Sequence, residues 1–317
     1  MMSYTAECLV SPIRFLIGSW LYIRLPIHKE FKTTVKKLEQ IVHNALSNAI
    51  KKLKIPKDEK KDITTDTTKL PCSNLMDIML HEYQKSASTF TEKVLRDQLG
   101  TFLAAGHDTT AALLSFTIYQ IYKHERRDEI VKLLREEATN VLGPLEALSS
   151  KHSIQYQHTA KLKYATACLQ ETLRLDTPGP IIARQATKKT SMLSSQNVKI
   201  PIPEGTSIWL AIYLLHRDKK YWSDPTLYKP ERWLNKNSTN TSRPSRPSTS
   251  YIPFSYGARN CVGQRFAMLE AATLLSLIVY RFDIELDEKK PPLIRETALV
   301  NRPRDGLWVK LQARKCK

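Results

Sequence analysis

The residues most capable of chemistry surround Cys261, in the stretch Pro253 to Ala267. Gly257 and Gly263 flank the cysteine, and glycine permits unusual backbone dihedral angles and close approach of a ligand. Apolar residues recur at helical spacing after this point, which predicts a helix that begins just past the cysteine. The positive end of that helix, together with Arg259, favours a thiolate, the form of cysteine that binds metal. From these residues alone, an ordinary buried cysteine remains the favoured interpretation.

A polar cluster lies inside a helix that the sequence predicts from Thr91 to about Lys123. The centre of this segment is apolar on every side, which predicts a helix buried in a large core. Asp108 and Thr109 interrupt the apolar surface shortly after Gly106, and burying such groups is costly unless they are paired. They could cap a second helix after a break at Gly106, or supply the acid and the hydroxyl of a proton relay.

A charged pair occurs in the helix predicted from Tyr164 to Leu175, where Glu171 precedes Arg174. As an isolated surface ion pair it would contribute only about 0.2 to 0.5 kcal/mol. The helix has an apolar face and is followed by a proline-rich break. These surroundings indicate that the pair is more than an ordinary surface ion pair.

The spacing Phe-x-x-Gly-x-Arg-x-Cys-x-Gly resembles the haem-binding loop of the cytochrome P450 family of haem-thiolate monooxygenases. Cysteine thiolate is the haem ligand of that family. The resemblance therefore implies that Cys261 is the axial ligand of a haem iron and that Arg259 pairs with a haem propionate. Phe254, Gly257 and Gly263 occupy the other motif positions and would belong to the same cofactor site.

Two further motifs resemble the same family. Ala105 to Thr110 is similar to the signature of its long distal helix, which implies that Asp108 and Thr109 deliver protons to iron-bound dioxygen. Glu-Thr-Leu-Arg is similar to a second family helix, and the strand after it would supply Arg184 to a propionate, a task suited to the planar arginine fork. The pair Asp176-Thr177 departs mildly from the proline-rich family pattern.

The segment Pro-Glu-Arg-Trp resembles a Pro-Glu-Arg-Phe segment of the family, with Trp in place of Phe. By resemblance, Arg232 joins Glu171 and Arg174 in a buried triad. Removal of one member of such a network would cost about 3 to 5 kcal/mol, because a buried charge is left uncompensated.

The lining of a substrate pocket is the least specific prediction. The resemblance implies five candidates, and their interpretation as ordinary core residues is at least as favoured. These candidates are Ala105, Ile181, Ile182, Leu299 and Val300.

The periodicities predict a mainly α fold with small β-sheets (α+β). The resemblance implies that this is the cytochrome P450 fold with its N-terminal part missing. We interpret residues 1–317 as one such domain, truncated at its N-terminus. Amphipathic helices are predicted in 1–53, one of them at 27–53, and a linker and a helix in 54–90. A haem-binding core is predicted in 91–317, with a further amphipathic helix at 128–141. A low-complexity insertion is predicted at 235–250, and a hairpin at 297–311 around an Asp-Gly turn.

Composition limits the compartment and the partners. The five cysteines contain no Cys-x-x-Cys pair and indicate a reducing environment, and no segment reaches the length of a membrane-spanning helix. Lys and Arg outnumber Asp and Glu by 49 to 31, a net charge of +18. Because basic residues do not form a stripe with interleaved aromatics, nucleic acid is disfavoured, and an acidic electron-donor protein or a membrane surface fits better.

The resemblance implies a monooxygenase that inserts one oxygen atom of O2 into a small apolar organic substrate, with haem b as cofactor. Electrons would come from NADPH through NADPH-cytochrome reductase. The full-length protein would lie on the cytosolic face of the endoplasmic reticulum membrane. The alternatives are a truncated, non-catalytic fragment without haem and a haem-thiolate isomerase or dehydratase. A cysteine-nucleophile enzyme is disfavoured, because no histidine stands near a comparable strand or loop signal.

Overall fold

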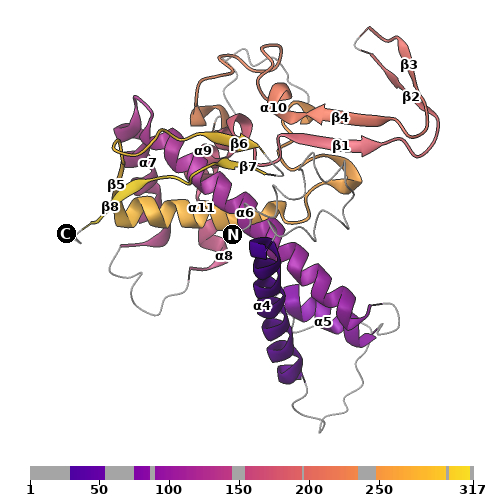
Figure 1. Cartoon of the computed structure of the whole chain (residues 1–317). Helices are drawn as coiled ribbons and strands as arrows, with labels where there is room; N and C mark the ends of the chain where they lie inside the picture. The colour runs from indigo at the N-terminus through magenta and orange to yellow at the C-terminus, as the bar shows by residue number, and fades with distance from the viewer. Residues whose placement is uncertain are drawn as a thin grey trace. The chain divides into compact units, whose positions relative to one another are not determined.

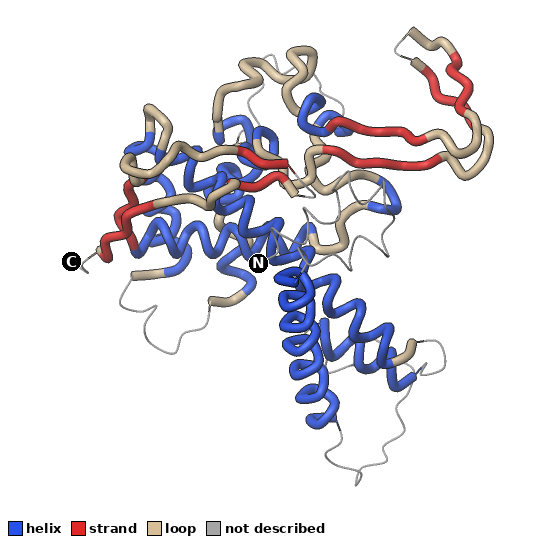
Figure 2. The backbone as a smooth tube through the Cα atoms, in the orientation of Figure 1, coloured by secondary structure: helices blue, strands red, loops and turns tan. Residues whose placement is uncertain are grey.

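The computed structural model has a mainly helical architecture with small antiparallel sheets (Figures 1 and 2), as the sequence predicts. The chain forms two compact units, Met1–Asp108 and Thr109–Lys317, and each is described by itself. The structure describes residues 29–53, 75–85, 90–144, 154–194, 196–234, 248–297 and 300–314.

The first unit contains α4 (Lys29–Leu53), α5 (Leu75–Lys85) and the first half of α6 (Glu92–Tyr122). Each helix contributes apolar side chains to a small core, in which Leu46, Leu80 and Leu95 are at most 2% exposed. The amphipathic helix predicted at 27–53 is confirmed as α4. The linker predicted from residue 54 lies outside the described residues as far as residue 74.

The helix predicted from Thr91 to about Lys123 is confirmed as α6, but its expected burial holds only in part. Leu113 and Phe116, in its second half, are at most 2% exposed and pack within the second unit. In contrast, Phe102 and Leu103 are 37% and 43% exposed. An apolar composition on all sides therefore did not predict burial of the first half, because the described residues cover these two side chains only in part.

Three helices build the core of the second unit: α7 (Arg127–Leu142), α9 (Lys163–Leu175) and α11 (Gln264–Arg281). Their apolar faces pack on one another and on the second half of α6, which confirms the helices predicted at 128–141, at 164–175 and after the cysteine. The carboxylate of Glu137 in α7 accepts the backbone N–H groups of Tyr164 and Ala165 at 2.6 and 2.9 Å. This contact satisfies two free donors at the start of α9 and joins the two helices.

Short strands pair into four two-stranded antiparallel sheets within the described residues. The figures show the first two sheets running together, so that the β2–β3 hairpin extends from the end of the β1–β4 pair (Figure 1). The pairs are β1 (Ile181–Gln185) with β4 (Ser207–Ala211), β2 (Thr190–Leu193) with β3 (Lys199–Ile202), β5 (Phe282–Leu286) with β8 (Val309–Ala313), and β6 (Arg295–Thr297) with β7 (Asn301–Pro303).

The hairpin predicted at 297–311 is wrong. The chain does turn at Gly306, where φ is +78°, but the strands on either side pair elsewhere. β7 pairs with β6, which precedes it, and β8 pairs with the distant β5. Pro303 ends β7 without an N–H to donate, and β5 offers β8 a five-residue register that the local turn cannot match.

Short helical turns complete the second unit: α8 (Tyr156–Thr159), α10 (Ile212–Leu215), η4 (Pro230–Trp233), η5 (Ser248–Ser250) and η6 (Gly257–Arg259). The low-complexity insertion predicted at 235–250 lies outside the described residues up to 247, and its last three residues form η5. In the described part of the chain, no helix is long and apolar enough to cross a membrane.

Candidate haem-thiolate site

The cysteine loop, residues 252–263, folds tightly and leaves its sulfur accessible. The backbone N–H of Cys261 donates to the carbonyl of Phe254 at 2.8 Å, which closes the loop. Gly257 has φ of +82°, a conformation that suits glycine, and Ser255 adopts φ of +67°. Cys261 itself is exposed and lies between η6 and the start of α11.

Gly257 and Gly263 play different structural parts, although both belong to the motif. Gly263 has an ordinary φ of −84°, and a Cβ added there would lie 3.9 Å from Sγ of Cys261, a normal van der Waals distance. Neither backbone angle nor space therefore demands glycine at Gly263. At Gly257 the positive φ alone accounts for the residue type.

Apolar side chains next to the thiol are left open to solvent. Val262 is 84% exposed, and Phe266 in the first turn of α11 is 70% exposed. Phe254 is half-buried and packs against the core of the second unit. Neighbouring exposed apolar side chains indicate a binding surface.

Two arginines predicted at the site have donors available for a carboxylate. Arg184, in β1, donates to the carbonyl of Ala183 at 2.9 Å and to Oγ of Ser255 at 3.4 Å, which connects β1 to the cysteine loop. Arg259 is exposed in η6. Among the described residues, neither arginine forms an ion pair with a carboxylate.

These features together suit one kind of ligand. An accessible thiol, adjoining apolar side chains and two guanidinium groups match a flat apolar macrocycle that carries a metal and two carboxylates. The donor set of the described residues therefore fits haem. Elsewhere in the described residues, no group of three or more His, Cys, Asp or Glu side chains is arranged to hold a metal ion.

The Glu171 network, which consists of Glu171, Arg174, Arg232 and Trp233, is brought together as the sequence predicts. Arg174 makes two bonds to the carboxylate of Glu171, at 2.8 and 3.1 Å, and both side chains are fully buried. Nε of Arg232 and Nε1 of Trp233 reach the same carboxylate at 3.2 and 3.0 Å.

Arg174 also ties together the chain around this network. Its guanidinium donates to the backbone carbonyls of His216, Pro225 and Leu227 at 3.0, 2.6 and 3.0 Å. All five N–H groups of this buried guanidinium are hydrogen-bonded, two to one carboxylate and three to backbone carbonyls. Arg174 therefore holds the segment before the cysteine loop and has no donor left for a ligand.

The polar cluster in α6 occupies consecutive positions of one unbroken helix. The proposed break at Gly106 and the second helix capped by Asp108 or Thr109 do not occur, because α6 runs from Glu92 to Tyr122. Asp108 and Thr109 are half-buried, and Ala105 is exposed. Asp108 ends the first compact unit and Thr109 begins the second.

The candidates for a substrate pocket are placed only in part. Ile181 is 49% exposed and Ile182 is half-buried, both in β1 beside Arg184. Val300 is half-buried just before β7, and Leu299 lies outside the described residues.

A second buried carboxylate, Asp176, was noted in the sequence only as a departure from the family pattern. It is fully buried, and its oxygens accept Nε of Arg295 at 2.5 Å and Nε2 of Gln120 at 2.6 Å. The sequence did contain one sign of a buried carboxylate, namely an acidic residue at the end of an apolar helix. Its partners could not be found from sequence, since they stand far away in the chain on α6 and β6.

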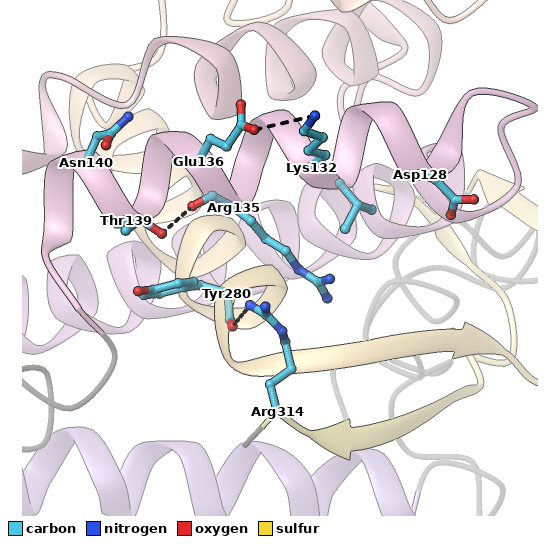
Figure 3. A pocket seen from close by; sticks show the side chains of 9 residues that line it. Asp128, Lys132, Arg135, Glu136, Thr139, Asn140, Tyr280 and Arg314 are labelled. Atoms are coloured by element: carbon cyan, nitrogen blue, oxygen red, sulfur yellow. Dashed lines mark hydrogen bonds and ion pairs between the residues drawn. The ribbon is translucent and has the colours of Figure 1, made fainter. Parts of the chain in front are cut away.

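A pocket of about 520 Å³ lies away from these residues, between α7 and the ends of α11 and β8 (Figure 3). Arg135 and Arg314 enter it, but Arg135 donates to the carbonyls of Val279 and Phe282 and to Asp283. Arg314 donates to the carbonyl of Tyr280 at 2.8 Å. The two arginines are therefore engaged in contacts that hold α7, α11 and the β5–β8 sheet together, while Lys132 pairs with Glu136 within α7 at 3.9 Å.

The accessible cysteine loop ahead of α11 suits the haem-thiolate class of proteins, and comparison with known sequences shows the family. The family model described as Cytochrome P450 matches residues 9–309. The chain belongs to the cytochrome P450 family, which confirms the resemblance found in its motifs. The family uses haem b, with dioxygen as co-substrate and NADPH as electron source through a reductase.

Curated relatives support the same assignment. Cytochrome P450 4V2 of Rattus norvegicus is 29% identical over 304 residues, which cover 95% of this chain and 54% of the relative. Cytochrome P450 4V2 of Homo sapiens is 30% identical, with 88% and 51% covered. Cytochrome P450 4B1 of Rattus norvegicus is 32% identical, with 75% and 43% covered. The chain thus spans about half the length of the curated relatives it matches.

Proposed function

We propose that this chain is the haem-binding portion of a monooxygenase that inserts one oxygen atom of O2 into a small apolar organic substrate. The observation that carries the proposal is the cysteine loop. Its exposed thiol stands beside exposed apolar side chains and near two arginines that have no carboxylate partner among the described residues. Family membership supplies the cofactor that such a donor set accepts.

Each predicted site residue has a definite task in this proposal. The thiolate of Cys261 binds the iron, Arg184 and Arg259 neutralise the propionates, and the turn at Gly257 holds the loop that carries the sulfur. When bound, haem supplies the activation of dioxygen. The family resemblance assigns proton transfer to the carboxyl group of Asp108 and the hydroxyl of Thr109, and contact with the substrate to Ile181, Ile182, Ala105, Leu299 and Val300.

The partners follow from the same chemistry. Electrons come from NADPH by way of NADPH-cytochrome reductase, which docks on a basic surface, since the chain carries a net charge of +18. We assign the full-length protein to the endoplasmic reticulum membrane, on its cytosolic face. The rate at which the reductase reduces the haem should fall as the salt concentration rises, because salt screens the attraction between the exposed charges of the two proteins.

Haem reconstitution of the 317-residue chain tests the proposal. One haem per chain and a thiolate-type spectrum of the reduced carbon monoxide complex are expected, and Cys261→Ser should abolish that spectrum. Cys168→Ala is the matched control, because Cys168 is a free but fully buried thiol whose pKa is raised by burial. A chain that takes up no haem would instead be a non-catalytic fragment.

The proton-transfer roles have a separate test. In a catalytically active preparation of the enzyme, Thr109→Ala should uncouple oxygen consumption from product formation, because the hydroxyl that passes the proton is lost. Unchanged coupling would favour a haem-thiolate isomerase or dehydratase, which needs no oxygen activation.

A further inference from the structure

His216 lies between the Glu171 network and the cysteine loop and has no role in the chemistry described above. It follows the last turn of α10, and its side chain is fully buried. Its ring stacks on Tyr251, with centroids 5.2 Å apart and 29° between the ring planes. A polar ring in such a position requires a reason.

The ring of His216 binds the start of the cysteine loop. Nε2 lies 2.9 Å from the backbone N–H of Ile252. Because a backbone N–H can only donate, Nε2 must offer a lone pair, and the proton of the neutral ring lies on Nδ1. The histidine therefore acts here as a hydrogen-bond acceptor.

Burial keeps this acceptor available. The pKa of His216 is lowered to about 4, chiefly by burial and also by the positive charges of Arg174 and Arg217. The backbone carbonyls of Leu173 and Arg174 oppose the shift, although Nδ1 forms no hydrogen bond of normal geometry within the described residues. The ring is thus neutral at neutral pH.

The backbone of the same residue belongs to the Glu171 network. Its carbonyl accepts Nη1 of Arg174 at 3.0 Å. His216 therefore contacts the fully buried Arg174 of this network through its main chain and the cysteine loop through its side chain.

Backbone hydrogen bonds connect the buried start of the loop, where His216 binds, to its exposed end. Ile252 is 6% exposed, and its carbonyl accepts the N–H of Ser255 at 3.0 Å. The carbonyl of Phe254 then accepts the N–H of Cys261 at 2.8 Å. A short series of backbone bonds thus connects the ring of His216 to the residue that carries the thiol.

We propose that His216 is a positioning residue that fixes the start of the cysteine loop through its bond to Ile252 and so aims the Cys261 thiolate at the haem iron. This inference rests on the proposed function for its haem part. The anchoring of the loop itself depends only on the protein.

Two amide substitutions separate the ring's contacts. His216→Gln places its side-chain oxygen near the position of Nε2 and can still accept the Ile252 N–H. His216→Asn places its oxygen near the position of Nδ1 and cannot reach it. His124→Asn is the matched control, since Nε2 of His124 also lies near a main-chain group, the Tyr228 carbonyl at 3.1 Å.

Hydrogen exchange of the haem-free chain gives the first measurement. His216→Asn should speed exchange of the hydrogen-bonded amides of Ile252, Ser255 and Cys261 at least about tenfold, the scale expected for loss of one buried hydrogen bond. His216→Gln and His124→Asn should leave these amides close to wild type. Equal protection in both His216 variants would overturn the anchoring.

The spectrum of the reduced carbon monoxide complex gives the second measurement, at equal haem content. His216→Asn should lose thiolate-type absorbance and His216→Gln should recover it, which a general loss of stability would not produce. Retained thiolate absorbance in His216→Asn would overturn the positioning role. If the wild-type chain itself shows no thiolate spectrum, the haem part fails with the proposed function, while hydrogen exchange still decides the anchoring.

Discussion

The Glu171 network and the cysteine loop lie on connected segments, yet they satisfy their polar groups in opposite ways. Glu171 and Arg174 are fully buried, and each finds its partners within the chain. Cys261 and Arg259 are exposed and have no ion-pair partner among the described residues. The first region is complete as protein alone, whereas the second presents groups that suit a bound cofactor.

This difference predicts that substitutions in the two regions will separate stability from haem binding. Loss of a buried partner should destabilise the chain strongly, because the charge left behind has no water to solvate it. Loss of a group in the loop should leave folding nearly intact and weaken the site. The following predictions test this separation, beginning with the largest effect.

Glu171→Gln is expected to lower the free energy of unfolding by about 3 to 5 kcal/mol, because the guanidinium of Arg174 loses its only carboxylate among the described residues. Urea denaturation measures the change. Glu129→Gln is the control: this carboxylate pairs with Arg126 on the surface, and its loss should leave the urea midpoint almost unchanged. Equal effects at the two sites would remove the distinction drawn above.

Stability should depend on pH through His216, the residue that joins the two regions. Its pKa falls from about 6.5 in the unfolded chain to about 4 in the folded chain, because burial disfavours the charged ring. Between these values the unfolded chain binds more protons, so stability rises with pH and falls as the solution is acidified from pH 6.5 to pH 4. The shift corresponds to about 3 kcal/mol.

The measurement is urea denaturation at several pH values, compared between wild type and His216→Gln. The Gln variant lacks the titrating ring and should lose most of this dependence over the same range. If both proteins show the same slope, the histidine is not buried as the structure places it.

Asp176→Asn is expected to cost about 2 kcal/mol, the scale of a hydrogen bond between charged groups. The change removes the ion pair with Arg295, whose Nε lies 2.5 Å from Oδ1, and keeps an oxygen for Gln120. The cost should be smaller than at Glu171, because Arg295 is 39% exposed and water can solvate it. Thermal unfolding of Asp176→Asn and Glu171→Gln side by side checks the order.

Gly257→Ala is expected to destabilise the chain by only about 1 kcal/mol, since φ of +82° disfavours a side chain while no atom lies within 4 Å of the added Cβ. Gly100→Ala is the control, because it lies inside α6 without positive φ and should stabilise by about 0.5 to 1 kcal/mol. Opposite signs in urea denaturation confirm that backbone angle, and not space, requires glycine in the cysteine loop.

Local patterns predicted the helices well. The apolar spacing around α7, α9 and α11 predicted all three helices, because each pattern records which face of a helix is buried. The hairpin at 297–311 was wrong for the opposite reason: an Asp-Gly turn is local, but β8 gains more by pairing with β5.

The candidate site shows the same limit. Motif spacing indicated Cys261, Arg184 and the Glu171 network, yet it could not indicate His216, a histidine outside every motif. Motif spacing also could not predict the contact between Asp176 and Arg295. Such contacts join segments that are distant in the chain, and no local sequence pattern predicts them.

The sequence by itself determined where the helices form and which cysteine is flanked by a haem-binding motif, because both depend on neighbours within a few positions. Only the tertiary structure decided which strands pair, which carboxylates are buried and what holds the cysteine loop at Ile252. These outcomes depend on the free energy of packing remote segments together, where burial makes every polar group find a partner.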